Sequence, residues 1–155
     1  MIYRPYSPAD FDKLYALEEV CFTPPTRFSQ RFMTSLVQSA NAATWIAEEA
    51  GQIVGFAIAD WAEEGNENAA YIQTVEVSPE ARGRGVGREL LNRIEGSARL
   101  ARACSIWLHV EEGNAAAIRL YESQGYRCED REEDYYPESR AALIYVKRLD
   151  TETAS

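Results

Sequence analysis

The sequence predicts an α+β domain in which a mixed sheet carries helices on its faces. Its pattern runs strand, two helices, three meandering strands, helix, strand, helix and two strands, an order typical of that class. The 155 residues suffice for one domain, which we place at 1–150, with a short tail at 151–155. With 46% hydrophobic and 26% charged residues, the chain has the composition of a folded domain rather than a disordered one.

The first elements are a strand and two helices. Residues 2–6 alternate like a short strand, and Ser7 caps a helix predicted over Ala9–Cys21, with proline at its first position. Ser29 caps a second helix. The predicted buried face of this second helix consists of Phe32, Leu36 and Val37.

A meander of strands leads into a long helix. Strands are predicted over 44–48, 53–60 and 71–77, with turns at 49–51 and 63–68. A helical pattern then runs from Val86 to Ala103, with apolar residues on one side.

A strand, a helix and two more strands complete the pattern. The strand is predicted over 105–110, and Asn114 then caps a helix that runs through Ser123, with Gly125 placed to stop it. The last two strands are predicted on either side of an acidic and aromatic loop, over 126–131 and 143–148.

Charge and composition exclude several classes of function. The chain carries 25 acidic and 16 basic residues, a net charge of −9, which argues against a non-specific nucleic-acid partner. No apolar run approaches the ~20 residues that cross a bilayer. Since the first ten residues also lack a secretion signal, we expect a cytoplasmic protein without a membrane partner. Scattered cysteines and the single His109 predict reduced thiols and no zinc site.

A glycine-rich turn is the most informative motif. A predicted strand runs into Arg82-Gly83-Arg84-Gly85-Val86-Gly87-Arg88, which opens a helix. Unpaired N–H groups and the helix dipole at such a start favour an anion, and glycine lets a phosphate approach the backbone. The spacing fits neither the dinucleotide fingerprint GxGxxG nor a Walker loop, and a turn without a ligand is the alternative. Local charge favours the phosphate, because residues 80–102 hold six arginines and three glutamates.

Two motifs, in order, resemble those of the GNAT N-acetyltransferase superfamily. Arg82-x-x-Gly85-x-Gly87 is similar to its acyl-CoA pyrophosphate motif, and residues 114–126 are similar to its helix near the thioester. The resemblance covers about residues 2–148. It implies a three-layer α/β/α arrangement, a mostly antiparallel seven-stranded sheet with about four helices, and a splay between strands four and five. It also implies acetyl-CoA as the acyl donor and no metal.

The resemblance implies which residues hold acetyl-CoA. Backbone groups of Val75 and Val77 would bind the pantetheine arm, and one of these amides would polarise the thioester carbonyl. Tyr121 would protonate the departing thiolate, or pack as a core aromatic, or do both. Asn114 either binds the cofactor or only caps its helix. The pyrophosphate would bind to Arg82, Gly83, Arg84, Gly85, Val86, Gly87 and Arg88.

Within the superfamily, the chain resembles N-terminal protein acetyltransferases, including the bacterial ribosomal-protein-alanine type. The resemblance rests on the paired tyrosines in Asp134-Tyr135-Tyr136-Pro137 and on Phe22-Thr23-Pro24-Pro25. The acidic turn usual after the tyrosines is here Glu138-Ser139-Arg140-Ala141, a departure that bears on peptide specificity. Strand alternation could turn Glu76 either toward the substrate or away from it. The expected substrate groove consists of Phe22, Pro24, Glu76, Tyr135 and Tyr136.

A histidine and a tyrosine are the expected proton-handling pair. Leu108-His109-Val110 stands where the ribosomal type has a glutamate and, with the segment 71–74, looks more like the eukaryotic N-α-acetyltransferase that prefers Met-initiated N-termini. That resemblance implies His109 and Tyr71. An α-amine ordinarily titrates at about 7.7–8.0 and lysine at about 10.4, so an imidazole, ordinarily near 6.5, is better matched to the α-amine. The alternative is a histidine that only packs on its strand.

The expected activity is acetyl transfer from acetyl-CoA directly to a primary amine, best matched by the N-terminal α-amine of a protein or peptide. Two alternatives stay open. A small amine such as a polyamine or an aminoglycoside would also be attracted by the acidic surface. The chain could instead be a CoA-binding module without catalysis. The amine-bearing acceptor would be the partner of a monomer or homodimer.

Overall fold

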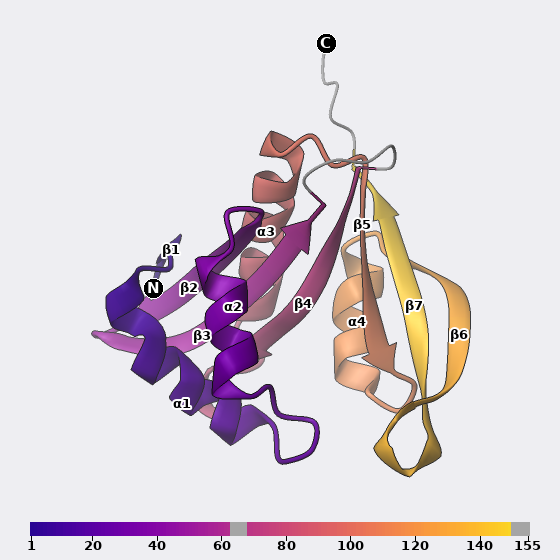
Figure 1. Cartoon of the computed structure of the whole chain (residues 1–155), viewed down its shortest axis with the longest axis horizontal. Helices are drawn as coiled ribbons and strands as arrows, with labels where there is room; N and C mark the ends of the chain where they lie inside the picture. The colour runs from indigo at the N-terminus through magenta and orange to yellow at the C-terminus, as the bar shows by residue number, and fades with distance from the viewer. Residues whose placement is uncertain (63–67, 150–155) are drawn as a thin grey trace.

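The computed structural model describes residues 1–62 and 68–149, and it contains one seven-stranded sheet and four α-helices (Figure 1). The strands are β1 (Ile2–Pro5), β2 (Ala42–Glu49), β3 (Gln52–Trp61), β4 (Ala69–Val77), β5 (Ser105–Glu111), β6 (Arg127–Tyr136) and β7 (Arg140–Arg148). The helices are α1 (Phe11–Cys21), α2 (Gln30–Gln38), α3 (Val86–Leu100) and α4 (Ala115–Ser123). The predicted tail at 151–155, and the predicted turn at 63–68 apart from Asn68, lie outside the described residues.

The sheet has the order β1-β2-β3-β4-β5-β7-β6, in which β4 and β5 are parallel and the other neighbours are antiparallel. Helices cover both faces. On one face α1 and α2 pack Leu14 and Met33 against Phe56 and Ile58 of β3. On the other face α3 and α4 cover a second core, whose fully buried members include Leu90, Leu91, Ile94 and Ile106. The predicted fold class is therefore confirmed, with its three layers and mostly antiparallel sheet.

The sheet splays between its two parallel strands. β4 and β5 pair over three residue pairs only, from Ala69 opposite Ser105 to Tyr71 opposite Trp107, and then diverge (Figure 1). An extra residue in β4 accompanies the divergence: Thr74 and Ile72 pair with consecutive residues of β3, which leaves Gln73 as a β-bulge. A bulge bends its strand and increases the local twist. The splay expected from the resemblance is thus present.

The helices differ from the prediction in three places. The first helix begins as a 3-10 turn at Pro8–Asp10, where the Asp10 carboxylate accepts from the Ser7 N–H and from Arg4. In α2, Phe32 is exposed and Met33 occupies the core, because Met33 and Leu36 share the face toward the sheet. The long helix α3 ends at Leu100 rather than at Ala103, since Arg102 adopts a left-handed conformation with φ of 69°.

The predicted acidic and aromatic loop is largely a strand. Instead of ending at Arg131, β6 continues to Tyr136, and a three-residue turn connects it to β7. β6 is an edge strand, and nearly all of its side chains are exposed. Such a strand lacks the apolar alternation that marks a half-buried strand, and its acidic side chains resemble a loop in the sequence. The paired tyrosines therefore lie at the end of a strand.

Candidate active site

The glycine-rich turn has a backbone suited to holding an anion. Gly83 and Gly85 have φ values of 77° and 84°, a left-handed region that favours glycine. Nothing lies within 4 Å of a Cβ built on Gly83, so the turn is open on this side. A Cβ on Gly87 would meet Leu120 at 3.3 Å, because α3 and α4 approach closely here. The first N–H groups of α3, beginning at the buried Val86, have no acceptor within the helix.

The arginines around this turn do not all point to one place. Arg82 donates from Nε to the Val77 carbonyl at 2.9 Å, and the Arg88 guanidinium lies over Gly85. Arg84 forms a two-point ion pair with Glu49 at the end of β2, with distances of 2.6 and 3.1 Å. In this structure, therefore, Arg84 binds a carboxylate rather than presenting its charge to the turn.

The remaining residues expected to contact acetyl-CoA lie on β4 and α4. Val75 and Val77 are in the part of β4 that has diverged from β5, where the backbone edge facing β5 is not used in strand pairing. Tyr121 is 7% exposed and packs edge-on against Tyr126, with ring centroids 5.6 Å apart. Burial raises the pKa of the Tyr121 phenol, so it stays protonated. Asn114 accepts from the Ala117 N–H at 3.2 Å, which is the predicted cap.

Tyr71 and His109 are in direct contact. The Tyr71 hydroxyl lies 2.8 Å from His109 Nδ1, across the last paired residues of β4 and β5. Burial is the main cause that raises the pKa of the Tyr71 phenol, and the nearby Tyr135 adds to it. The two residues that the resemblance implied as a proton-handling pair therefore form a hydrogen-bonded unit.

The β6–β7 hairpin closes over the His109 imidazole. The Tyr135 ring stacks on it, with centroids 4.2 Å apart and planes within 11°. Tyr136 contacts Tyr135 edge-on at 4.9 Å. A glutamate that the sequence did not single out completes the contacts: Glu132 Oε1 lies 3.0 Å from His109 Nε2. Glu132 lies in a run of acidic residues, and no periodic pattern in this part of the sequence distinguishes it from its acidic neighbours.

The other two expected groove residues lie in the loop between α1 and α2. Pro24 is exposed and Phe22 is half-buried, with the Phe22 carbonyl accepting from Arg27 Nε at 3.0 Å. This loop lies at the end of the molecule toward which β4 and β5 diverge (Figure 1). The loop and the hairpin thus flank the open end of the splay from two different parts of the chain.

Glu76 does not line an open groove, which corrects the expected role in substrate binding. It is 3% exposed and lies against Glu18 of α1, because strand alternation turned it toward this helix. It accepts from Thr74 Oγ1 at 2.8 Å. Burial, the hydrogen bond with Glu18 and the charge of Glu18 raise the pKa of Glu76 to about 10. Glu76 therefore lies in the helix–sheet interface, where burial favours its protonated form.

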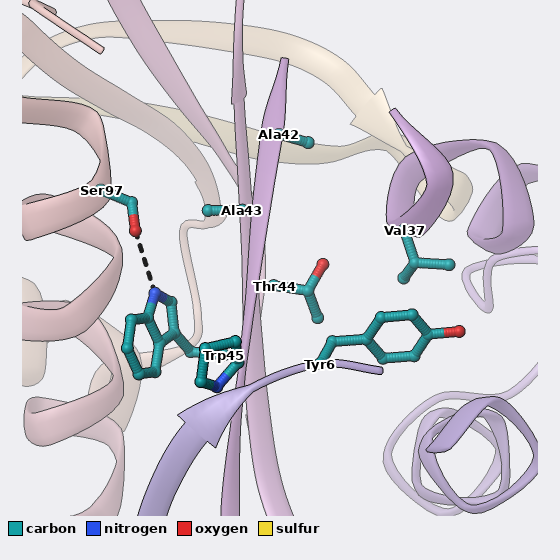
Figure 2. Close-up of a pocket in the computed structure, with 8 residues that line it drawn as sticks. Tyr6, Val37, Ala42, Ala43, Thr44, Trp45 and Ser97 are labelled. Atoms are coloured by element: carbon teal, nitrogen blue, oxygen red, sulfur yellow. Dashed lines mark hydrogen bonds between the residues drawn. The ribbon is translucent and has the colours of Figure 1, made fainter. Parts of the chain in front are cut away.

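A pocket of about 270 Å³ lies elsewhere, at the edge of the sheet beside the end of β1 (Figure 2). In Figure 2 Tyr6, Thr44 and Val37 lie on one side of β2, while Trp45 lies on the other and donates from Nε1 to Ser97 Oγ at 3.0 Å. None of the residues predicted for catalysis, cofactor or substrate lines this pocket. We therefore place the candidate active site at the splay.

The sequence of the chain, taken with this geometry, decides the family. Residues 11–126 match the acetyltransferase (GNAT) family, about three quarters of the chain. The chain belongs to the GNAT family. A GNAT acetyltransferase uses acetyl-CoA as its acyl donor, and the left-handed glycines, the free start of α3 and the unpaired edge of β4 fit the pyrophosphate and pantetheine of that donor.

Known relatives and structures agree with this GNAT assignment. The chain is 30% identical over 155 residues to an uncharacterized N-acetyltransferase of Methanocaldococcus jannaschii, covering 96% of this chain and 92% of that one. It is 27% identical to the histone acetyltransferase MCC1 of Arabidopsis thaliana, covering 86% of this chain and 63% of that protein. The crystal structure of the ribosomal-protein-S18-alanine N-acetyltransferase from Escherichia coli shares the fold, with a TM-score of 0.85, 24% identity, and 99% and 96% of the two chains covered. Among residues 1–62 and 68–149, no helix is long and apolar enough to cross a membrane.

Proposed function

We propose that this GNAT acetyltransferase acetylates the N-terminal α-amino group of a protein or peptide. The observation that carries the proposal is the Tyr71–His109 pair, with Tyr135 of the β6–β7 hairpin stacked on the imidazole. An aromatic hairpin against a proton acceptor suits an extended peptide end, whose first residue can contact the tyrosine rings. The fold shared with the ribosomal-protein-S18-alanine N-acetyltransferase from Escherichia coli is consistent with a protein acceptor.

The acidity of the acceptor also favours an α-amine. At neutral pH a peptide α-amino group, with an ordinary pKa of about 7.7–8.0, is neutral far more often than a lysine side chain at about 10.4. A site that removes one proton through Tyr71 and His109 therefore needs less free energy to deprotonate an α-amine than a lysine side chain. The proton passes to the Tyr71 oxygen while the Tyr71 proton moves to His109 Nδ1.

The other residues bind the donor and stabilise the leaving group. The turn of Gly83 and Gly85 holds the pyrophosphate, and the N–H groups of β4 near Val75 and Val77 donate to the pantetheine and the thioester carbonyl. Acetyl-CoA supplies the activated acetyl group. Because burial raises the pKa of the Tyr121 phenol, Tyr121 serves as a hydrogen-bond donor to the departing sulfur.

The deciding experiment measures CoA thiol release from acetyl-CoA with a panel of acceptors: free N-terminal peptides, N-blocked peptides that contain lysine, polyamines and aminoglycosides. Saturable turnover with free α-amino peptides, lost in His109→Ala while acetyl-CoA binding is kept, is the expected result. Turnover with N-blocked lysine peptides or with polyamines alone would contradict the proposal.

A small cationic amine is the second candidate, because of the acidic surface beside His109. The exposed carboxylates on β6, from Glu129 to Asp134, lie next to the imidazole contact made by Glu132. Such a surface raises the local concentration of a polycation. The same panel distinguishes the two candidates, since a polyamine acceptor would lose activity steeply at high salt and would not need the tyrosine hairpin.

A further inference from the structure

His109 uses both of its ring nitrogens in hydrogen bonds. Nδ1 lies 2.8 Å from the Tyr71 hydroxyl and Nε2 lies 3.0 Å from Glu132 Oε1. The imidazole side chain is only 11% exposed, whereas the Glu132 side chain is 47% exposed. His109 therefore connects a buried phenol to a carboxylate at the surface.

We propose that Glu132 is a positioning residue for the proton relay: its carboxylate holds His109 in the tautomer that can accept a proton from Tyr71. The proposal rests on the proposed function, in which Tyr71 and His109 handle the proton of the amine. Glu132 itself gains and loses no covalent bond in this scheme.

The tautomer follows from the chemistry of the two partners. An ionised carboxylate can only accept a hydrogen bond, so His109 Nε2 must carry the proton that it shares with Glu132. A neutral imidazole has one donor and one acceptor nitrogen, which makes Nδ1 the acceptor. The Tyr71 hydroxyl then donates to Nδ1.

The proton balance of the step uses this arrangement. As the amine proton passes to the Tyr71 oxygen, the phenolic proton moves to His109 Nδ1 and the imidazole becomes an imidazolium. Glu132 offsets the new positive charge through the bond to Nε2. Since burial holds the Tyr71 phenol in its protonated form, the relay passes a proton on only as another arrives.

An irregularity in β6 brings two side chains to one imidazole. Glu132 and Tyr135 are three residues apart, and on a regular strand they would point to opposite faces of the sheet. Here the register shifts between Glu132, opposite Ala142, and Tyr136, opposite Arg140. Asp134 adopts a left-handed φ of 56° within this bulge. The bulge therefore lets both side chains contact His109, while Glu133 pairs with Arg131.

The groups around His109 come from three strands. Tyr71 of β4 and Glu132 and Tyr135 of β6 contact the ring, and Trp107 of β5 lies beside it. Beyond Tyr71, the charge of Asp60 on β3 contributes to the raised pKa of the Tyr71 phenol. Among these, Glu132 is the carboxylate that is hydrogen-bonded to the imidazole.

The experiment compares Glu132→Ala and Glu132→Gln with the matched control Glu133→Gln, whose side chain pairs with Arg131. We expect Glu132→Ala to lower kcat with the best peptide by about 10- to 100-fold, as for carboxylates that orient a metal-binding imidazole, with the KM for acetyl-CoA unchanged. Glu132→Gln keeps a hydrogen-bond acceptor but no charge. We therefore expect partial activity and an acidic limb of the kcat/KM profile moved to lower pH, because imidazolium loses its counter-charge.

A second readout needs no activity. His109 is the single histidine of the chain, so protein labelled with ¹⁵N-histidine gives one pair of imidazole signals. We expect the Nε2–H tautomer in the wild-type protein and in Glu133→Gln, and a mixture of tautomers in Glu132→Ala. An Nδ1–H tautomer in the wild type, or a Glu132→Ala enzyme with unchanged kcat and pH profile, would overturn the proposal. If no peptide is acetylated, the proposed function fails, while the tautomer result still tests the role of Glu132.

Discussion

Glu18 on α1 and Glu76 on β4 form a buried carboxyl pair at the helix–sheet interface. They are 1% and 3% exposed, and burial together with the neighbouring Glu18 carboxyl raises the pKa of Glu76. Within the described residues, one oxygen of each, Glu18 Oε1 and Glu76 Oε1, is buried without a hydrogen-bond partner. Because burial and the neighbouring carboxyl raise the pKa of Glu76 to about 10, Glu76 keeps its proton at neutral pH. Glu18 Oε2 also accepts from the Phe28 N–H at 2.8 Å, so the carboxyl pair is in contact with the loop before α2.

The proton held by Glu76 predicts that the stability of the protein falls as the pH rises. The unfolded chain releases the proton near the ordinary Glu value of 4.5, whereas the folded chain holds it until about pH 10. The stabilising contribution is therefore complete below 4.5 and is lost progressively between 4.5 and 10, by up to about 1.4 kcal/mol per pH unit. In Glu76→Gln an amide N–H replaces the proton. We expect the variant to be more stable than the wild type at pH 8, by about 1–3 kcal/mol, with a flatter pH dependence.

Urea unfolding at pH 5 to 9 measures both quantities. Glu80→Gln is the matched control, because Glu80 lies on the exposed turn after β4 and should leave the pH dependence parallel to that of the wild type. A Glu76→Gln protein that is less stable than the wild type at pH 8, with the same slope against pH, would show that Glu76 does not hold a proton in the folded protein.

The ion pair between Arg84 and Glu49 predicts that removing the glutamate strengthens CoA binding. Arg84 lies in the turn expected to hold the pyrophosphate, but its guanidinium binds the Glu49 carboxylate at 2.6 Å. Glu49→Gln frees that charge and removes a negative charge near the phosphates. Since exposed ion pairs contribute little, we expect the Kd for CoA to fall by about two- to fivefold. Titration calorimetry at two salt concentrations measures it, and the gain should shrink as salt screens the charges.

The ion pair of Arg93 with Glu89 on α3 provides the control for this measurement. Glu89→Gln also removes one acidic charge from an arginine pair, but on the helix rather than at the turn. An equal gain in affinity in Glu89→Gln would mean that net charge, rather than the release of Arg84, explains the effect.

Substitutions at Tyr121 and Gly85 should separate turnover from CoA binding. The first should lower turnover, and the second should weaken the binding of CoA. Tyr121→Phe keeps the packing against Tyr126 and removes only the hydroxyl, so we expect an unchanged Kd for CoA and a kcat lowered by about 10²-fold or more. Gly85→Glu places a carboxylate and a Cβ at a left-handed position of the turn, so we expect CoA binding weakened by about tenfold or more. Calorimetry and steady-state kinetics on both variants test this. A Tyr121→Phe enzyme with normal kcat would leave Tyr121 as a packing residue.

The sequence predicted the elements that depend on local signals and on the family motifs. The order of strands and helices, the Ser29 and Asn114 caps and the glycine-rich turn that opens the long helix were all readable from residue type and spacing. The Tyr71–His109 contact joins residues 38 positions apart, and only the family resemblance brought them together. Periodicity alone would have left His109 as a packed residue on a strand.

What the sequence missed depends on two irregular strands. The bulge at Gln73 and the turn of β4 toward α1 placed Glu76 against Glu18, a pairing across the chain that no local pattern reports. In β6 the side chains are exposed on both faces, so the strand shows no apolar alternation in the sequence. The bulge at Asp134 then determines which carboxylate contacts His109. Bulges shift the side-chain period by one, so predictions that count alternate residues fail beyond them.

The left-handed conformation of Asp134 predicts a link between backbone geometry and catalysis. Aspartate tolerates a φ of 56°, glycine adopts it freely, and a β-branched residue is disfavoured there by about 1–2 kcal/mol. Asp134→Gly should therefore keep the bulge, whereas Asp134→Val should shift it and pull Glu132 and Tyr135 away from the imidazole. We expect a kcat near that of the wild type for Asp134→Gly and a loss of about tenfold or more for Asp134→Val, comparable with Glu132→Ala. The imidazole ¹⁵N signals should change in the valine variant alone. If both variants lose activity equally, the aspartate side chain rather than the backbone conformation is what the site requires.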